Sequence, residues 1–576
     1  MDAPIPQKPP EIRELTPRSI AVALGVALLI GASYPYIVLK FGFGPNISVV
    51  SAFFGFLALG IFSKNYNRWE NNIVQTAGTT AGQIAFLCWL LAAFDMLAAE
   101  PGSGFTVHLT ILQTFLWLSI AGILGVLLAV PLRKHFIVDE KLTFADGVAA
   151  AETLILLDSK GAQAKKSATV MVGSMLTSGM LMFATSRAWM TDLFRIHLNQ
   201  FSQATGVGFG ISLLSIGSGM IIGLRICFSM LIGAIAAWVV LPALLANAGV
   251  IAPGATKTAI LLWVMWPATG LLVAGGLTAL GLKWRVLLRT FTSLREGSVD
   301  SGDFPMRWLG IGVGVSTVAL VIVQYAFIGT PVWQSVVAIA LSVPLMLVAL
   351  RVLGETNWGP ISTMTNVMQA MFGALAPGDL RAGMISSGIT ASVAAESEGL
   401  MQDYKTGHLI GSTPRSLTYM QLIAVPFGAL ALAFIYPLLR DTYGIGDSGQ
   451  LSSPTSVRWV GFAKILSKGF SQLPPSAITA LFVGAALGII FTLLEQKKEW
   501  RNFVPSPTGL GIGMLVPANA IATMFLGALG DWIWRQTKPD SAVRYSIPVA
   551  SGFIAGDALV AVILPITYVM GIWGPP

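Results

Sequence analysis

The run Ser19–Leu39, SIAVALGVALLIGASYPYIVL, decides the fold class. It contains no charged side chain, and about 20 apolar residues are enough for a helix to cross the hydrocarbon core of a bilayer. The rest of the chain has the same character, because 54% of its 576 residues are apolar and only 11% are charged. A soluble domain carries about 25% charged residues. An ordinary soluble protein is therefore excluded, and the sequence predicts an all-α polytopic membrane protein.

Working outward from this run, apolar segments of spanning length recur along the whole chain, eight in each half. They cover residues 19–39, 46–62, 72–98, 107–131, 168–186, 207–223, 227–247, 258–281, 308–329, 332–350, 358–376, 382–400, 416–438, 475–494, 508–534 and 546–570. We therefore expect about 16 transmembrane helices. This organisation predicts a tail at 1–17, a first membrane half at 18–282, a basic linker at 283–307 and a second membrane half at 308–576.

One further apolar segment, Leu142–Leu157, is short and has basic residues at both of its ends. If it crossed the membrane, positive charge would face both sides, which the positive-inside tendency disfavours. We therefore expect a re-entrant hairpin here. With that assignment most Lys and Arg residues of the first half fall on the side of the amino terminus, so both termini are predicted to be cytoplasmic and the protein to lie in the plasma (inner) membrane.

The two halves share short motifs in the same order, which indicates an internal duplication. The matched pairs are Asn72-Ile-Val-Gln75 with Asn366-Val-Met-Gln369, Ala150-Ala-Glu152 with Ala394-Ala-Glu396, Gly208-Phe-Gly-Ile211 with Gly509-Leu-Gly-Ile512, and Thr269–Gly275 with Ser551–Gly556. Duplicated membrane halves are typical of transporters, whose sites lie at the repeat interface near the midplane. An extra span between the Asn-x-x-Gln and the Glu motifs of the first half keeps the two copies from being superimposed in topology.

These stretches resemble the oligopeptide transporter (OPT) family, and its metal-chelate, yellow-stripe-like side more than its peptide side. The resemblance covers nearly the whole chain, and its most specific block is DYKTGHLIGSTPRSLTYMQL at 403–422; KLTFADGVAAAETL at 141–154 and PVASGFIAGDAL at 548–559 are further parts of it. It implies about sixteen spans and secondary active uptake, driven by protons, of small peptides or metal–chelate complexes. Both cargo classes stay open.

Acidic residues at membrane depth are the first candidates for a functional site. A charged carboxyl there costs roughly 2.5–3.5 kcal/mol, so it persists mainly by facing a cavity or by carrying a proton. Glu396 and Asp403 are seven residues apart and would share one helical face, whereas Glu398 points nearly the opposite way. The alternative is a structural role, in which a buried Glu152 or Glu396 pins helices and Asp403 is an interfacial charge.

The remaining candidates are polar groups that could contact cargo carboxylates and amides. They are Asn72, Gln75, Asn366, Gln369, Lys405 and Asp557, alongside the carboxyls Glu152, Glu396 and Asp403. Helix–helix hydrogen bonding explains the four amides equally well. The expected partners are a peptide or metal–chelate cargo, protons and the lipid bilayer. Gly219-x-x-x-Gly223 would permit a homodimer, and nucleic acid is not expected.

Enzymes and metal centres find little support in the sequence. His108, His135, His197 and His408 have no paired spacing, and Cys88 and Cys227 lie far apart, so we expect no metal site, cofactor or catalytic residue. Gly444-Ile-Gly-Asp447 matches an intramembrane aspartyl protease motif, but the Pro242-Ala-Leu244 match precedes it, which is the wrong order. An ion channel is the other rival, and it would conduct without a proton gradient.

Overall fold

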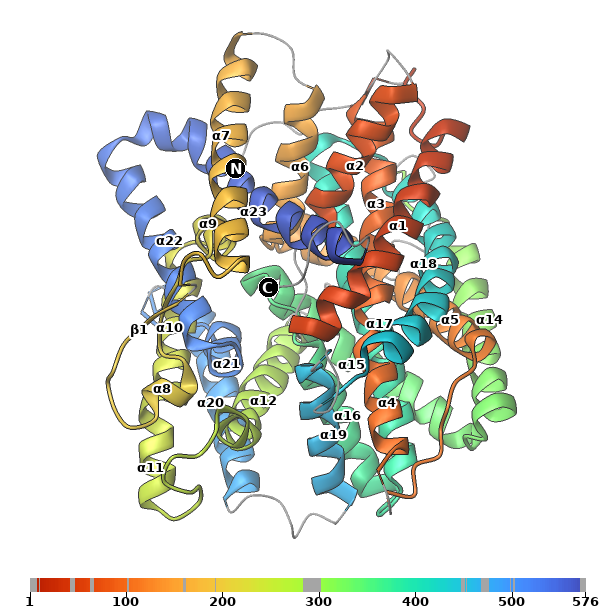
Figure 1. Ribbon diagram of the computed structural model, residues 1–576, viewed down its shortest axis with the longest axis vertical. Helices are drawn as coiled ribbons and strands as arrows, with labels where there is room; N and C mark the ends of the chain where they lie inside the picture. The colour runs from red at the N-terminus through yellow and green to blue at the C-terminus, as the bar shows by residue number, and fades with distance from the viewer. Residues whose placement is uncertain are drawn as a thin grey trace.

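The computed structural model describes residues 8–569 except 10, 42–46, 63–66, 101–102, 159–161, 192, 283–301, 447–450, 452, 468–475, 498 and 501–502. Helices make up nearly all of it (Figure 1). The one sheet in this part of the chain is a short antiparallel pair, β1 (Leu193–Arg195) with β2 (Gly208–Gly210). Within these described ranges, ten helices are long and apolar enough to cross a membrane. The predicted all-α membrane class is confirmed; most of the predicted linker lies outside the described residues, as does Asp447.

The described residues of the first half form twelve helices and three irregular helical turns. They are α1 (Pro17–Phe41), α2 (Ile47–Phe62), α3 (Arg68–Phe86), α4 (Cys88–Ala98), α5 (Ile111–Ala129), η1 (Val130–Leu132), η2 (Lys134–Asp139), α6 (Ala145–Asp158), α7 (Ala162–Ser186), α8 (Ser202–Thr205), α9 (Leu213–Ile222), α10 (Leu224–Ile235), η3 (Ala236–Val240), α11 (Leu241–Asn247) and α12 (Lys257–Leu282).

The described residues of the second half form ten further helices and one irregular turn. They are α14 (Met306–Val323), η5 (Gln324–Ile328), α15 (Val332–Thr356), α16 (Ile361–Leu375), α17 (Leu380–Ile410), α18 (Pro414–Tyr443), α19 (Pro454–Ser467), α20 (Ala477–Glu495), α21 (Pro507–Leu515), α22 (Ala518–Thr537) and α23 (Pro539–Val569).

Most predicted segments coincide with helices, and the differences have local causes. The helix α19 was not predicted, because Thr455, Ser456 and Arg458 interrupt its apolar pattern. The predicted span 508–534 is broken into α21 and α22 at Pro517. The segment 142–157 contains the continuous helix α6 instead of a hairpin. At 1.5 Å per residue its 14 residues reach about 21 Å, which is shorter than the roughly 30 Å hydrocarbon core.

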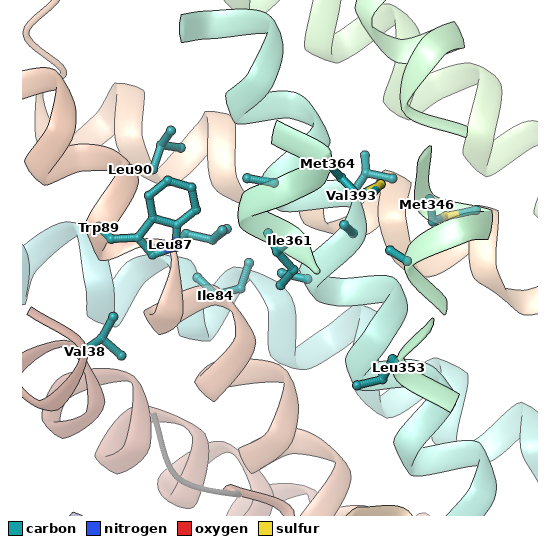
Figure 2. Packing of buried hydrophobic residues seen from close by; sticks show 14 of the residues in the cluster. Val38, Ile84, Leu87, Trp89, Leu90, Met346, Leu353, Ile361, Met364 and Val393 are labelled. Atoms are coloured by element: carbon teal, nitrogen blue, oxygen red, sulfur yellow. The ribbon is translucent and has the colours of Figure 1, made fainter. Parts of the chain in front are cut away.

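The helices pack as two bundles, and each bundle combines parts of both halves of the sequence. The first bundle consists of α1–α6 with α14–α19, and the second of α7–α12 with α20–α23. In Figure 1 the second bundle lies to the left and the first to the right. Figure 2 shows part of the apolar core of the first bundle, in which Ile84 and Trp89 from the first half belong to the same buried cluster as Val393 and Met364 from the second. The sequence halves are therefore interlocked.

The packing of the second bundle repeats itself between the halves. Its α12 packs along α20 as α23 packs along α7, and α9 packs on α22 as α21 packs on α10. A Cβ added at Gly219 would lie 1.9 Å from the backbone oxygen of Met524, and one at Gly513 would lie 2.0 Å from that of Met230. Gly219 precedes Gly513 by the same number of residues as Met230 precedes Met524, so α9 and α10 correspond to α21 and α22.

This symmetry supports one motif match from the sequence and corrects another. Gly270 and Gly552, at the same place in the Thr269–Gly275 and Ser551–Gly556 motifs, both abut a backbone oxygen, of Leu481 at 2.1 Å and of Met171 at 2.4 Å from an added Cβ. The Gly208–Ile211 match is wrong in register. Gly208 lies in β2, and the equivalent of Leu510-Gly-Ile-Gly-Met514 is Ile216-Gly-Ser-Gly-Met220.

In the first bundle, the close contacts at glycines indicate other equivalent helices than the Asn-x-x-Gln and Ala-Ala-Glu motif matches do. An added Cβ at Gly125 of α5 would meet the backbone oxygen of Val393 in α17 at 2.7 Å, and one at Gly428 of α18 would meet Cα of Ala81 in α3 at 2.9 Å. Thus α5 corresponds to α18 and α3 to α17, and α6 takes the place of α19. The helices that carry Asn72 and Asn366 are then not equivalent, and neither are those of Glu152 and Glu396. With these equivalences, the extra span no longer separates the two copies.

Candidate functional site

A polar seam runs through the core of the first bundle, where α3 and α17 lie antiparallel. It consists of Asn72, Gln75, Thr79 and Gln83 on α3, Glu396 and Asp403 on α17, and Gln421 on α18; we call it the α3–α17 seam. Near the start of α3, Asn72 Nδ2 donates to Ser412 Oγ at 2.8 Å, just after α17 ends. Further along, Gln83 lies against Gly399. The three- and four-residue spacing puts the α3 side chains on one face.

Capping residues explain where α3 begins and where α17 begins and ends. The side chain of Asn67 caps α3 by accepting from the backbone N–H of Glu70, and the carboxylate of Glu70 pairs with Arg18 of α1. The helix α17 begins at the N-cap Asp379, whose side chain accepts from the backbone N–H of Ala382 at 2.9 Å, and ends at Gly411 in the left-handed region. Although α17 is polar, nearly all of its residues are buried, so it needs partners on every side.

Asp403 is tied to three helices by a chain of hydrogen bonds. Gln75 Nε2 donates to Asp403 Oδ1 at 2.6 Å and to Thr79 Oγ1 at 2.9 Å, and Thr79 Oγ1 in turn donates to Ser48 Oγ of α2 at 3.1 Å. Asp403 is fully buried, and its other oxygen, Oδ2, has no hydrogen-bond partner among the described residues. The carboxyl is therefore only half satisfied.

Glu396 lies two turns away on α17 and is more isolated. It is 0% exposed, and both of its carboxyl oxygens lack a hydrogen-bond partner in the described part of the chain. Gln421 Nε2 donates to its backbone oxygen at 3.4 Å, so this amide lies beside it without satisfying the carboxyl. Gly399 lies between Gln83 and Gln421 and leaves room for both amides next to the helix.

The unsatisfied atoms of the seam are all acceptors. Within the described ranges they are Asn72 Oδ1, Gln75 Oε1, Asp403 Oδ2, Gln421 Oε1 and both carboxyl oxygens of Glu396. Each buried acceptor without a donor costs about 1–3 kcal/mol. A proton on either carboxyl turns one of these acceptors into a donor. A species that brings hydrogen-bond donors or positive charge would therefore stabilise the seam.

Lys405 lies at the edge of the seam but serves the start of α6. Its Nζ donates to the backbone oxygen of Leu142 at 2.7 Å. One turn of α17 around it is joined to Gly147 of α6, because Thr406 Oγ1 donates to the oxygen of Gly147 and Gln402 Oε1 accepts from its N–H. The structure thus gives Lys405 a structural contact, and its predicted role at the cargo path stays a prediction.

Four of the predicted residues lie outside the seam. Glu152 is half-buried on α6, which already contacts residues 402–406 at Gly147 and runs on away from Glu396. Asp557 of α23 accepts from the backbone N–H of Leu214 at 3.4 Å and so caps the start of α9. Asn366 and Gln369 lie on α16, where Gln369 lines a small pocket between α16, α17 and α19.

The structure therefore brings together Asn72, Gln75, Glu396 and Asp403, and it adds Thr79, Gln83 and Gln421. The spacing of Asn72, Gln75, Thr79 and Gln83 along one helical face was visible in the sequence. Nothing in the sequence alone said that α17 would cover that face. No group of three or more His, Cys, Asp or Glu side chains in the described residues is arranged to hold a metal ion.

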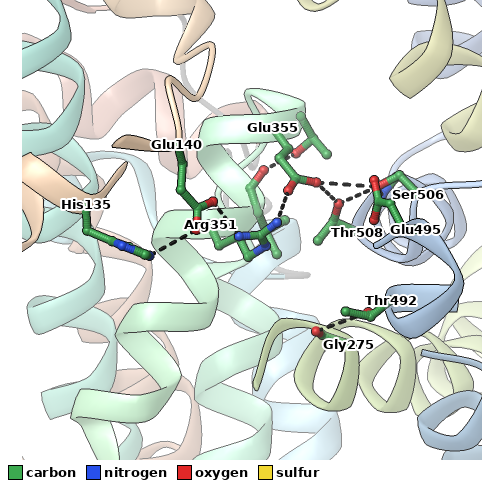
Figure 3. Close-up of polar contacts among 12 residues, drawn as sticks. His135, Glu140, Gly275, Arg351, Glu355, Thr492, Glu495, Ser506 and Thr508 are labelled. Carbon is green, nitrogen blue, oxygen red and sulfur yellow. Dashed lines mark hydrogen bonds and ion pairs between the residues drawn. The ribbon is translucent and has the colours of Figure 1, made fainter. Parts of the chain in front are cut away.

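A second polar cluster, which the sequence reading missed, joins the two bundles (Figure 3). We call it the interbundle network; its members are His135, Glu140, Arg351 and Glu355 of the first bundle, and Ser506 and Thr508 at the start of α21 in the second. Here every carboxylate has a cationic or hydroxyl partner. A neighbouring ion pair joins Arg225 of α10 to Glu495 of α20 at 2.6 Å.

Comparison with known proteins identifies a family model and several transporters that are similar to this chain. The family model "OPT oligopeptide transporter protein" matches residues 14–568. The chain is 25% identical to the metal-nicotianamine transporter YSL2 of Oryza sativa subsp. japonica, over 96% of this chain and 92% of the relative. It is 24% identical to the iron-phytosiderophore transporter yellow stripe 1 of Zea mays, over 92% and 88%. The putative oligopeptide transporter YGL114W of Saccharomyces cerevisiae is 29% identical over 40% of this chain and 33% of its own length.

Proposed function

The chain belongs to the OPT oligopeptide transporter family, and from that premise we propose that it is a proton-coupled secondary transporter whose α3–α17 seam carries the coupled proton. As a member of this family it is a multi-pass membrane transporter of small molecules and not an enzyme.

The observation that carries the proposal is the set of buried acceptors without donors in the seam. A proton is the smallest species that can satisfy them, and both carboxyls are buried too deeply for a large cargo to reach without helix movement. With a proton, Glu396 can donate to a neighbouring amide oxygen. Without it, the charge must be compensated from outside the seam, which links proton release to a change of conformation.

The cargo we propose is a metal–chelate complex. The relatives that match almost end to end are named for metal-nicotianamine and iron-phytosiderophore transport, which supports this assignment. Small peptides are the second candidate, because the yeast relative carries the name of a putative oligopeptide transporter. The described residues offer no cluster of protein ligands for a bare metal ion, so a metal cargo would arrive already wrapped by its chelator.

Uptake into proteoliposomes tests the coupling. A panel of metal–nicotianamine complexes and dipeptides is offered with an imposed pH gradient in sodium-free buffer. Accumulation that follows the gradient is the expected result. Flux that ignores the gradient would favour a channel, and strict dependence on sodium would replace the proton.

The topology completes the proposal. We propose about sixteen crossings, cytoplasmic termini in the plasma membrane, and a re-entrant segment between Lys134 and Lys165 in which the continuous helix α6 forms only one arm, because its 14 residues are too short to cross the hydrocarbon core. The domain limits predicted above and a homodimer are part of the same proposal. Cysteine labelling at Lys134 and Lys165 should report the same side, and opposite sides would refute the re-entrant assignment.

A further inference from the structure

Glu398 is a buried carboxyl that belongs neither to the α3–α17 seam nor to the interbundle network. We propose that it binds an amine of the cargo, at a place where helix ends meet on the boundary between the two bundles. The ligand class is an amine that carries hydrogen, either the ammonium group of a peptide or a metal-bound amine of a chelate. The proposal rests on the transport function proposed above and names a contact for its cargo. It does not depend on proton coupling or on Glu396.

The side chain of Glu398 points away from the seam, toward the turn 357–360 between α15 and α16. It is 4% exposed, and its Oε1 is buried without a hydrogen-bond partner among the described residues. The carboxyl lies against Gly359, where an added Cβ would be 2.8 Å from Oε1 and still closer to Oε2. Gly359 itself is exposed. The unsatisfied carboxyl therefore lies beside a stretch of backbone that reaches the molecular surface.

Helix ends from different parts of the chain meet at this turn. The helix α6 begins beside it, because the backbone N–H of Asp146 donates to Asn357 Oδ1 at 3.0 Å and Asn357 Nδ2 donates to Asp146 Oδ1 at 2.7 Å. On the other side, Trp358 Nε1 donates to Met524 Sδ of α22, in the second bundle, at 3.4 Å. Short and interrupted helices that meet between two repeats are typical of the cargo sites of secondary transporters.

The turn lies deep in the molecule along the direction of α17. At 1.5 Å per residue, Glu398 lies about 27 Å after the start of this helix at Leu380 and about 18 Å before its end at Ile410. Irregular backbone at membrane depth occurs only where it is buried in protein or lines a water-filled space, and not where it faces lipid. Because Gly359 is exposed, we infer that the turn lines a space that water and cargo can enter.

The neighbouring acidic groups already have partners. Glu355, at the end of α15, pairs with Arg351 at 2.9 Å and accepts from the hydroxyls of Ser506 and Thr508 (Figure 3). Asp146 accepts from Asn357, as described above. Gln402, one turn after Glu398, donates to Asn357 Oδ1 at 3.3 Å and accepts from the backbone N–H of Gly147 at 2.8 Å.

The chemistry of a single carboxylate selects the ligand. A carboxylate only accepts hydrogen bonds, so Glu398 needs a donor or a cation. A bare metal ion would need further ligands, and the described residues contain no group of three or more His, Cys, Asp or Glu that could hold one. An amine that carries hydrogen supplies donors with positive charge, and such charge-assisted hydrogen bonds are about twice as strong as neutral ones. Both proposed classes of cargo contain amines.

Equilibrium binding to the purified full-length protein tests the proposal with two pairs of probes. One pair is a dipeptide and its N-acetylated form. The other is nickel–nicotianamine and nickel–nitrilotriacetate, of which only the first has amine N–H groups. In the wild type, the amine-bearing member of at least one pair should bind about tenfold more tightly than its partner, and the pair that discriminates identifies the source of the amine.

This wild-type comparison needs no variant. Equal binding within both pairs overturns the proposal. If neither amine-bearing probe binds, the proposal fails together with the cargo assignment. Binding that prefers the amine, in a protein that shows no gradient-driven uptake, would contradict only the proton coupling proposed above.

Variants then assign the preference to Glu398. Glu398→Gln removes the charge and should raise the Kd of the amine-bearing probe about tenfold or more, while the Kd of its partner changes by less than about twofold. Glu398→Asp keeps the charge and should retain part of the preference. Glu152→Gln removes a carboxyl elsewhere and is the control with wild-type binding. An equal loss for both probes in Glu398→Gln, or wild-type binding of the amine-bearing probe, overturns the role of Glu398.

Discussion

The α3–α17 seam and the interbundle network are both buried and polar, yet they are satisfied in opposite ways. In the seam, two carboxyls and three amide oxygens lack donors among the described residues. In the network, Arg351 and the hydroxyls of Ser506 and Thr508 supply donors to both carboxylates, while neither ring nitrogen of His135 makes a hydrogen bond within the described residues. A closed set of partners holds parts of a protein together, whereas an open set of acceptors is costly unless it binds something. The comparison distinguishes a contact that stabilises the packing of the bundles from the cluster that we propose as the proton-binding site.

The largest expected effect concerns Glu396. Glu396→Gln keeps the shape and adds a donor but cannot titrate, so the seam is permanently in its protonated form. We expect gradient-driven accumulation to fall by about a hundredfold or more, with cargo exchange retained within about threefold. Uptake assays in proteoliposomes measure both. Wild-type accumulation would contradict the assignment, and loss of folded protein would support a helix-pinning role instead.

The next effect concerns the stability of the network. Arg351→Gln leaves Glu140 and Glu355 buried without their cation, and breaking a buried pair in this way costs about 3–5 kcal/mol. The melting temperature in detergent should fall accordingly. The double variant Arg351→Gln with Glu355→Gln should recover a good part of the loss. If the double variant is as unstable as the single one, charge balance is not what holds the network.

A smaller effect is expected for Gln421, whose substitution tests whether the seam contributes to stability or to transport. Gln421→Leu removes an amide whose oxygen has no donor, so the free energy of unfolding should change by no more than about 1 kcal/mol. Accumulation should nevertheless drop severalfold, because the amide lies beside Glu396. Thermal unfolding and uptake are measured on the same preparation. A large destabilisation would make the seam a structural element like the network.

The smallest effect is expected for Glu152, the residue that the sequence paired with Glu396. Because α6 carries it away from the seam, Glu152→Gln should change accumulation by less than about twofold. A loss as large as that of Glu396→Gln would indicate that the two carboxyls act in one site, and it would contradict the exclusion of Glu152 from the seam.

Much of the fold could be predicted from the composition and from the lengths of the apolar segments. Which helices of the two halves correspond to each other could not be predicted in this way. The predicted spans match most helices, and the glycine motifs at Thr269 and Ser551 occupy equivalent places in the packing. The matches of Asn72 with Asn366 and of Glu152 with Glu396 failed, because a few polar residues shared by two segments do not show which helices are equivalent. The glycine contacts do show which helices are equivalent, because the same close approach of two backbones recurs at corresponding glycines in the two halves.

The sequence by itself determined that this is a helical membrane protein of the OPT family, because chain-wide hydrophobicity and long motifs survive any arrangement of the helices. It also placed Glu396 and Asp403 on one face of one helix. Only the tertiary structure decided that Gln75 and Gln421 join them, that Glu152 and Asp557 do not, and that His135 lies beside Glu140 between two bundles. The physical reason is that hydrogen bonds and ion pairs depend on distances of about 3 Å between residues far apart in the chain, and spacing along one helix cannot supply those.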